Sequence, residues 1–142
     1  KPYTFCFAGR LEDAKGVKRI LEAFSHIKNK EQVKEIHLIG DGVQMKAYKA
    51  MAEKMEIQVN FHGFLSFYKV FEIYKKSHFF LLPSSASEGF PKVIAEAMNF
   101  GCIPIVSEIS SIGQYIQDER NGLIVASVIS EVLHLSLPKD IS

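Results

Sequence analysis

The chain has 142 residues, of which 47% are apolar and 23% charged, and its formal net charge at pH 7 is +1. These proportions are typical of a globular domain with a buried core, and the length predicts one domain. The balanced charge argues against a basic surface for nucleic acid or for an anionic membrane. The longest apolar runs are also far too short to span a bilayer.

The first half of the chain alternates apolar runs with segments of helical periodicity. The aromatic-rich run at 3–9 ends in glycine and predicts a buried strand. Apolar residues then recur at helical spacing over 17–27, which predicts a helix. The run at 35–40 predicts a second strand, and the periodicity of 45–55 a second helix.

The second half continues the same alternation. In chain order we expect a strand at 57–63, a helix at 67–77, a strand at 78–83, a helix at 91–100 that ends at Gly101, a strand at 103–107, a short helix at 111–117, a strand at 122–125 and one last helix in the tail.

Alternating strands and helices, with strands that are continuous apolar runs, are typical of a parallel sheet covered on both faces. The sequence therefore predicts an α/β fold, a doubly wound Rossmann-like parallel sheet of about six strands with helices on both faces. Ligands of such folds bind beyond the carboxyl ends of the strands, near the point where the strand order reverses. The loops that directly follow the strands are therefore the candidate binding segments.

The loop after the first strand, GRLEDAKG, carries two cations. Arg10 lies just past the strand, and Lys15 lies just before the first helix. A planar guanidinium and a compact ammonium group together suit the oxygens of a diphosphate. The alternative is that both are solvated surface charges, as most lysines and arginines are.

The loop after the fourth strand, SSASEGFP, leads into a helix N-terminus. Pro91 is suited to the first helical position, because its missing N–H would have no partner there. The free N–H groups of Gly89, Phe90, Lys92 and Val93 would attract an anion. Gly89 also lets a ligand approach the backbone closely.

Two glutamates flank this turn. Glu88 precedes the helix, and Glu96 lies five residues past Pro91, roughly 7.5 Å along a helix axis at 1.5 Å per residue. Carboxylates only accept hydrogen bonds, so both would bind hydroxyl groups such as those of a sugar and a ribose. Alternatively, Glu88 stabilises the helix dipole and Glu96 is an exposed mid-helix residue.

The sequence lacks the motifs that bind nicotinamide or flavin cofactors and metal ions. The first loop has no GxGxxG motif, and the GDG at 40–42 is only a turn signal, so we expect no nicotinamide or flavin cofactor. No DxD motif occurs, and the histidines are scattered, so we expect no metal ion. Positive side chains and the helix start would have to stabilise a leaving diphosphate.

The segments FAGRLEDAKG, IHLIGDG, FHGFL, EGFPKVIAEAM, GCIPIVS and NGLIV occur in an order that resembles a known family. They are similar to the C-terminal domain of GT-B, retaining glycosyltransferases of family 4 (glycosyl transferases group 1). Glu88 and Glu96 match the E-x7-E motif of that family. The resemblance covers about residues 4 to 126 and implies that 1–142 is the donor-nucleotide-binding domain, without the N-terminal acceptor domain.

The resemblance implies roles for individual residues. Arg10 and Lys15 would hold the donor diphosphate and stabilise it as it leaves, Glu88 would contact the donor sugar, and Glu96 would bind ribose hydroxyls. Arg10, Lys15 and Glu88 are thus the expected catalytic residues. The other expected substrate-binding positions are Gly9, Gly63, Phe64, Leu65, Ser66, Gly89, Phe90, Pro91 and Val93. Pro91 and Lys92 stand where many members carry glycine or another small residue, so one phosphate-facing amide is lost and a cation is gained.

The implied function is that of a metal-independent retaining glycosyltransferase. It would transfer a sugar from a nucleoside-diphosphate sugar to a glycan or lipid-linked acceptor in polysaccharide or lipopolysaccharide biosynthesis. The acceptor would bind the N-terminal domain, so the isolated chain should transfer nothing. We expect a cytoplasmic location, at the inner membrane face if the complete protein binds the membrane peripherally, and no nucleic-acid partner.

Three alternatives remain open. A nucleotide-sugar epimerase of GT-B architecture would share the diphosphate site. A non-catalytic binding module would keep the fold without the chemistry. A retaining glycoside hydrolase would need its two carboxyl groups about 5 Å apart, which the separation of Glu88 and Glu96 does not favour.

Overall fold

A computed structural model describes residues 2–27, 30–82, 92–107 and 123–125. In these segments six strands form one sheet in the order β3-β2-β1-β4-β5-β6, and neighbouring strands pair in parallel. The strands are β1 (Tyr3–Ala8), β2 (Val33–Ile39), β3 (Val59–Gly63), β4 (Phe79–Leu82), β5 (Ile103–Ser107) and β6 (Leu123–Val125). The helices are α1 (Val17–Ser25), α2 (Met45–Glu53), α3 (Phe67–Lys76) and α4 (Lys92–Asn99), with short 3-10 turns η1 (Asp13–Lys15) and η2 (Lys30–Gln32).

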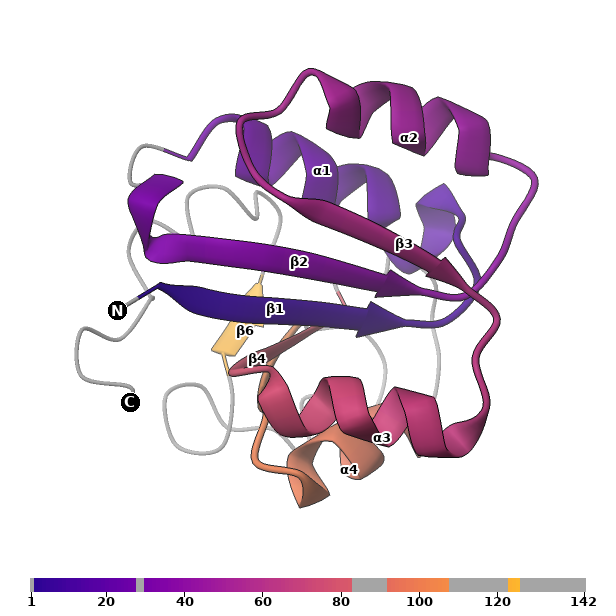
Figure 1. Ribbon diagram of the computed structural model, residues 1–142, viewed down its shortest axis with the longest axis vertical. Coiled ribbons are helices and arrows are strands. Elements are labelled where there is room, and N and C mark those ends of the chain that lie inside the picture. The colour runs from indigo at the N-terminus through magenta and orange to yellow at the C-terminus, as the bar shows by residue number, and fades with distance from the viewer. Residues whose placement is uncertain (1, 28–29, 83–91, 108–122, 126–142) are drawn as a thin grey trace.

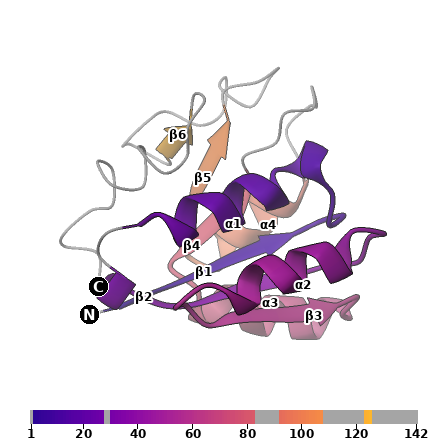
Figure 2. The ribbon, with the colours of Figure 1, turned by 90° about the horizontal axis from the view of Figure 1, so that it is seen from above.

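The helices cover both faces of the sheet. Helices α1 and α2 lie over one face, and α3 and α4 lie under the other (Figure 1). Seen from the side of α1 and α2, these two helices lie beside each other over the strands (Figure 2). This arrangement confirms the predicted doubly wound α/β fold.

The core is centred on β1 and β4, in which every residue is buried. The helical periodicity that predicts α1 corresponds to its packing, because Val17, Ile20, Leu21 and Phe24 are completely buried. Burial of each such side chain contributes about 1.5–3 kcal/mol. The predicted apolar face of the second helix also packs on the core, with Tyr48 buried and Met45, Ala52 and Met55 partly buried.

Some element boundaries differ from those predicted. β2 begins at Val33, two residues before the predicted start, because Val33 pairs with Tyr3 at the beginning of β1. β3 begins at Val59 rather than 57 and is an edge strand whose residues are all half-buried. The helices predicted at 111–117 and in the tail lie outside the described residues, as does Pro91 at the start of the fourth helix.

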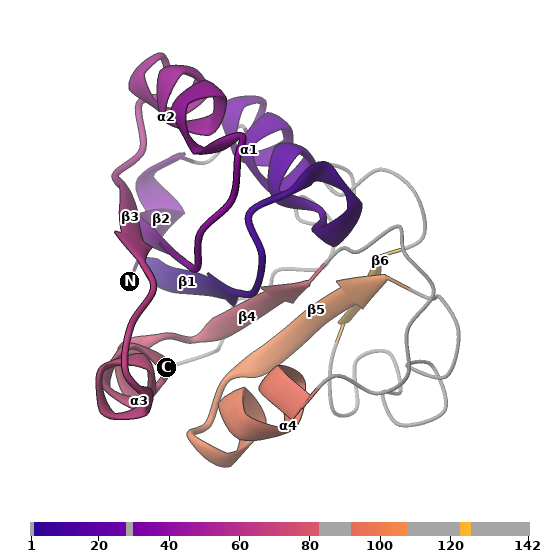
Figure 3. The ribbon, with the colours of Figure 1, turned by 90° about the vertical axis from the view of Figure 1, so that its right-hand side faces the viewer.

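The strand order reverses at β1, which has β2 on one side and β4 on the other. The carboxyl ends of β1, β2 and β3 face the viewer in Figure 3. Backbone hydrogen bonds tie these ends together: the Gly9 N–H donates to the Ile39 carbonyl at 3.0 Å, and the Gly40 N–H donates to the Gly63 carbonyl at 2.8 Å. The reversal point is where a doubly wound fold is expected to bind its ligand.

Gly40 fixes the approach of the first two loops. Its φ is +132°, and a Cβ atom at this position would lie 1.8 Å from the Gly9 carbonyl oxygen. No larger residue fits there without displacement of backbone, so the turn after β2 requires glycine.

Candidate functional site

A cavity of about 590 Å³ opens at the carboxyl ends of β1, β2 and β3. Its volume falls within the roughly 300–1,000 Å³ of typical ligand pockets. The described residues that line it are Ala8, Gly9, Arg10, Ile39, Gly40, Asp41, Phe64, Leu65, Ser66, Phe67, Val70, Tyr74, Val93 and Glu96. The lining therefore joins three strand ends, α3 and α4 in one concave site.

The β1 exit contributes a cation to this cavity. The Arg10 side chain is 75% exposed, and its Nε lies 3.4 Å from Glu12 Oε2. An exposed ion pair of this kind contributes at most about 1 kcal/mol, so it holds the guanidinium only weakly. The remaining N–H groups of Arg10 can donate to a bound anion.

Helix α4 contributes Val93 and Glu96 to the cavity lining. They lie three residues apart and therefore share one side of the helix. Val93 and Glu96 are both half-buried, and both line the cavity. The structure thus brings the first loop and α4, predicted from distant parts of the sequence, to one site.

The loop between β3 and α3 forms a third wall. Phe64, Leu65 and Ser66, three of the predicted substrate-binding positions, line the cavity; their role in binding stays a prediction. Phe64 is 89% exposed, so its ring presents a free aromatic surface at this site. Gly63 ends β3 directly before this loop and bonds to Gly40, which does line the cavity.

Lys15 takes a different position from Arg10. It is half-buried in η1 and is not among the residues that line the cavity. A hydrogen bond of 2.7 Å from the Tyr48 hydroxyl to Asp13 Oδ1 ties η1 to α2. The structure therefore holds Lys15 on the loop that carries Arg10, but outside the described cavity wall.

Four of the predicted site residues, Glu88, Gly89, Phe90 and Pro91, lie outside the described residues. Their predicted roles stay predictions. Glu96, the second glutamate of the motif, is described and lines the cavity.

Sequence reasoning missed several residues of the cavity. Phe67, Val70 and Tyr74 lie on one side of α3 at positions i, i+3 and i+7 and all line it. Their helical spacing was visible in the sequence, but it is also the spacing of core residues. Asp41 lines the cavity too, and its Oδ1 accepts a 2.8 Å hydrogen bond from the Gly42 N–H.

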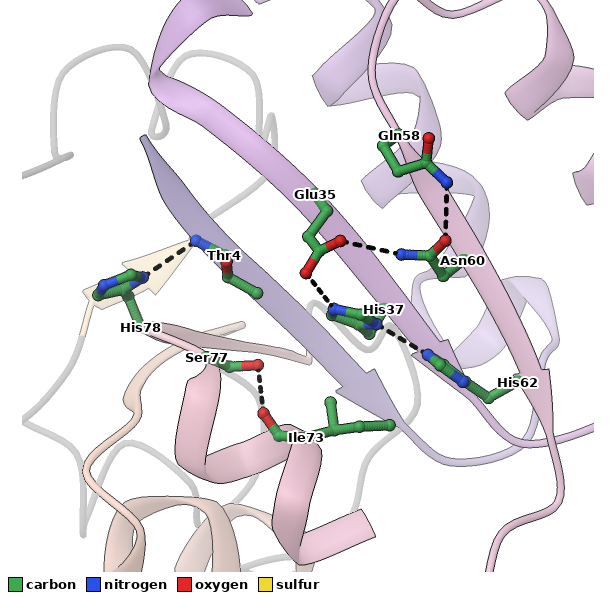
Figure 4. Close-up of polar contacts among 9 residues, drawn as sticks. All are labelled: Thr4, Glu35, His37, Gln58, Asn60, His62, Ile73, Ser77 and His78. Carbon is green, nitrogen blue, oxygen red and sulfur yellow. Dashed lines mark hydrogen bonds and ion pairs between the residues drawn. The ribbon is translucent and has the colours of Figure 1, made fainter. Parts of the chain in front are cut away.

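A second group of polar side chains lies between neighbouring strands (Figure 4). We call Glu35, His37, Asn60 and His62 the β2–β3 polar cluster. His37 Nε2 lies 2.9 Å from Glu35 Oε2, and His37 Nδ1 lies 2.8 Å from His62 Nε2. Asn60 Nδ2 donates to Glu35 Oε1 at 3.3 Å. Because a carboxylate only accepts, neutral His37 donates from Nε2 and accepts from His62 at Nδ1.

The pKa values of this cluster follow from its burial and charges. Burial lowers the pKa of His37, and Lys76 lowers it further against the opposing effect of Glu35. Burial also lowers the pKa of His62, with help from His37 and Lys76. For Glu35, burial alone would raise the pKa, but the hydrogen bond from His37, with the charge of Lys76 and the hydrogen bond from Asn60, lowers it overall. The lowered pKa values therefore favour neutral side chains for His37 and His62 and a charged carboxylate for Glu35.

Two kinds of feature are absent from the described part of the chain. Its His, Cys, Asp and Glu side chains form no group of three or more that is arranged to hold a metal ion. None of its helices combines the length and the apolar character that a membrane span needs.

The sequence profile of the family described as glycosyl transferases group 1 matches residues 1–136. The chain belongs to this family. The match confirms the predicted family, and the parallel sheet with helices on both faces is that of a C-terminal domain of a GT-B glycosyltransferase.

The group 1 glycosyltransferases that this chain resembles are longer than the chain. It is 34% identical over 110 residues to a lipopolysaccharide 1,6-galactosyltransferase of Salmonella typhimurium, covering 75% of this chain and 30% of that protein. Its fold matches the apo form of the lipopolysaccharide outer core galactosyltransferase WaaB, with a TM-score of 0.80, 29% identity and coverage of 95% of this chain and 39% of that chain. The chain thus spans about a third of the curated relatives that it matches.

A further structure shares the fold alone. The Anabaena protein HepE in complex with UDP-glucose matches with a TM-score of 0.81 at 22% identity, over 95% of this chain and 38% of that chain.

Proposed function

We propose that this chain is the donor-binding half of a retaining glycosyltransferase that needs no metal ion. The complete protein transfers a sugar from a nucleoside-diphosphate sugar to a glycan or lipid-linked acceptor in lipopolysaccharide or polysaccharide synthesis. One observation carries the proposal: a single cavity is lined by the Arg10 cation and the Glu96 carboxylate, from segments far apart in the sequence. The name of the Salmonella relative supports the lipopolysaccharide assignment.

In this proposal the chain binds the donor by complementary chemistry. Arg10, with Lys15 on the same loop, binds the negative diphosphate, and Glu96 accepts hydrogen bonds from ribose hydroxyls. The exposed ring of Phe64 and the adjoining Leu65 and Ser66 lie against the base. Glu88 and the amides around Phe90 complete the donor site at the sugar and the phosphates.

The reaction then requires little covalent participation by the protein. The acceptor hydroxyl attacks the anomeric carbon on the face from which the diphosphate departs. The bond from that carbon to the diphosphate oxygen breaks, a bond to the acceptor oxygen forms, and the acceptor proton passes to the departing diphosphate. Arg10 and Lys15 stabilise the negative charge that develops on the leaving group, so rate acceleration rests on positioning and electrostatics.

The test is calorimetric titration of the complete protein with UDP, GDP and ADP. One of the three binds best, and Arg10→Ala and Lys15→Ala each weaken its binding by about tenfold to 100-fold, because hydrogen bonds to charged groups contribute about 1.5–3 kcal/mol. Lys46→Ala, which removes an exposed cation of α2 outside the cavity lining, serves as the matched control. Unchanged affinity in both test variants would remove the diphosphate assignment.

Three further measurements address the finer parts of the proposal. A chelator such as EDTA leaves nucleotide affinity and transfer unchanged if no metal ion takes part. The anomeric configuration of the product, read by NMR, distinguishes retention from inversion. Mass spectrometry that finds an altered sugar with no acceptor consumed would instead indicate an epimerase.

We also propose that the isolated segment 1–142 binds nucleotide weakly and transfers no sugar, because the acceptor binds the remainder of the protein. Sugar transfer by the isolated segment would contradict the proposal that the acceptor binds the remainder of the protein. The complete protein would act in the cytoplasm, at the inner membrane face if it binds lipid-linked acceptors, which cell fractionation tests.

A further inference from the structure

Tyr74 has a polar group without a partner. Its side chain is completely buried, and its hydroxyl makes no hydrogen bond, whereas no other buried side-chain nitrogen or oxygen in the described residues lacks one. A buried tyrosine hydroxyl ordinarily has a partner, because an unpaired one loses its hydration without compensation. This exception therefore calls for an explanation.

The position of Tyr74 relates it to the candidate site. It lies on α3 and lines the cavity together with Glu96 of α4. Its ring packs edge-on against Phe80, with centroids 5.8 Å apart, and lies tilted against Phe100, with centroids 6.3 Å apart. These aromatic contacts hold the ring, so the hydroxyl has little freedom to find a partner elsewhere.

The chemistry of the neighbouring groups indicates the missing partner. Burial, followed by the nearby Cys6 and Glu96, raises the pKa of Tyr74, so the phenol keeps its proton and remains a donor. Glu96 is half-buried and acts only as an acceptor when ionised. Tyr74, whose buried hydroxyl lacks an acceptor, thus lines the same cavity as Glu96, and the Glu96 carboxylate contributes to the raised pKa of that hydroxyl.

We propose that Tyr74 is a positioning residue of the ribose subsite, whose hydroxyl donates to the Glu96 carboxylate when a nucleotide is bound. This inference rests on the proposed function, in which Glu96 binds ribose. One carboxylate oxygen then accepts from Tyr74, and the other accepts from a ribose hydroxyl. The tyrosine fixes one rotamer of a flexible side chain and so reduces the entropy lost on binding.

The test uses the complete protein and the nucleoside diphosphate that it binds best. Tyr74→Phe removes one oxygen and leaves the ring packing in place. We expect about threefold to tenfold weaker nucleotide binding and less discrimination against the 2′,3′-dideoxy analogue. Binding of inorganic pyrophosphate, which has no ribose, stays unchanged.

Two comparisons separate positioning from a general structural effect. In a Glu96→Ala background, Tyr74→Phe should weaken binding no further, because the group that it positions is gone. Tyr68→Phe on the same helix is the matched control, since Tyr68 is 84% exposed and does not line the cavity. It should leave nucleotide affinity unchanged.

Each contrary result has a distinct meaning. Wild-type affinity in Tyr74→Phe, equal weakening of nucleotide and pyrophosphate, or an undiminished effect in the Glu96→Ala background would each overturn the role of Tyr74. In the first case the wild type still binds nucleotide, so the proposed function would stand. A wild-type protein that binds no nucleoside diphosphate would overturn the proposed function and this inference together.

Discussion

The cavity and the β2–β3 polar cluster both place polar side chains in a largely apolar fold, but they pair those side chains differently. In the cluster, Glu35, His37, Asn60 and His62 hydrogen-bond to one another. Among the residues that line the cavity, Arg10 holds only a weak exposed ion pair, and the buried Tyr74 hydroxyl has no partner.

This contrast distinguishes polar side chains that stabilise the fold from polar side chains that can bind a ligand. Buried polar groups that satisfy one another stabilise and orient the strands that carry them. Polar groups that remain unsatisfied at a concave surface have free capacity for a ligand. We therefore expect changes in the cluster to alter stability, and changes of cavity side chains to alter binding.

The largest effect should come from the backbone that underlies the cavity. Gly40→Ala would place a Cβ atom 1.8 Å from the Gly9 carbonyl oxygen at a φ of +132°. We expect a loss of about 2–5 kcal/mol in unfolding free energy, from steric overlap and backbone strain, together with loss of nucleotide binding. Chemical denaturation followed by circular dichroism measures the loss.

Gly101→Ala is the matched control for this change. Gly101 also has a positive φ, +90°, but nothing lies within 4 Å of its Cβ position. It should lose only the backbone strain, about 1–2 kcal/mol. Equal losses of unfolding free energy in the two variants would mean that the contact between Gly40 and the Gly9 carbonyl does not restrict which residue fits at position 40.

The cluster should show the opposite behaviour. His37→Leu removes the ring that joins Glu35 to His62 and leaves both without their shared partner. We expect about 1–3 kcal/mol lower unfolding free energy, with nucleotide affinity unchanged. Glu35→Gln, which keeps an acceptor oxygen, should lose less. If His37→Leu weakened nucleotide binding while the fold stayed intact, the division between the two regions would be wrong.

The fold could be predicted because its elements are encoded locally. The continuous apolar run of β1 and the helical spacing in α1 each indicate one element. The placement of Arg10 and Glu96 in one cavity followed from a general property of parallel sheets, whose carboxyl ends share an edge.

The remaining features depend on tertiary contacts. His37 and His62 are 25 residues apart and meet only because β2 and β3 pair in one particular register. Tyr74 follows the same apolar helical pattern as residues of the core, so nothing in the sequence distinguishes its unpaired hydroxyl. The β1–β2 pairing likewise set the start of β2 at Val33, which periodicity alone misplaced.

The smallest effect should be a loss of stability in mild acid. Burial lowers the pKa values of His37, His62 and His78, and His78 Nδ1 accepts a hydrogen bond from the Thr4 N–H. As the pH falls, the histidines of the unfolded chain bind protons before those of the folded chain. The contribution of these histidines to the stability of the fold is therefore complete above the ordinary histidine pKa of about 6.5 and declines below it. Glu35, whose pKa is also lowered, adds a loss of the same sign at lower pH. The midpoint temperature of thermal unfolding should therefore decrease as the pH is lowered from 7.5 to 5.5. The decrease should be less steep in His37→Leu. An equal slope in that variant would show that the cluster does not carry the pH dependence.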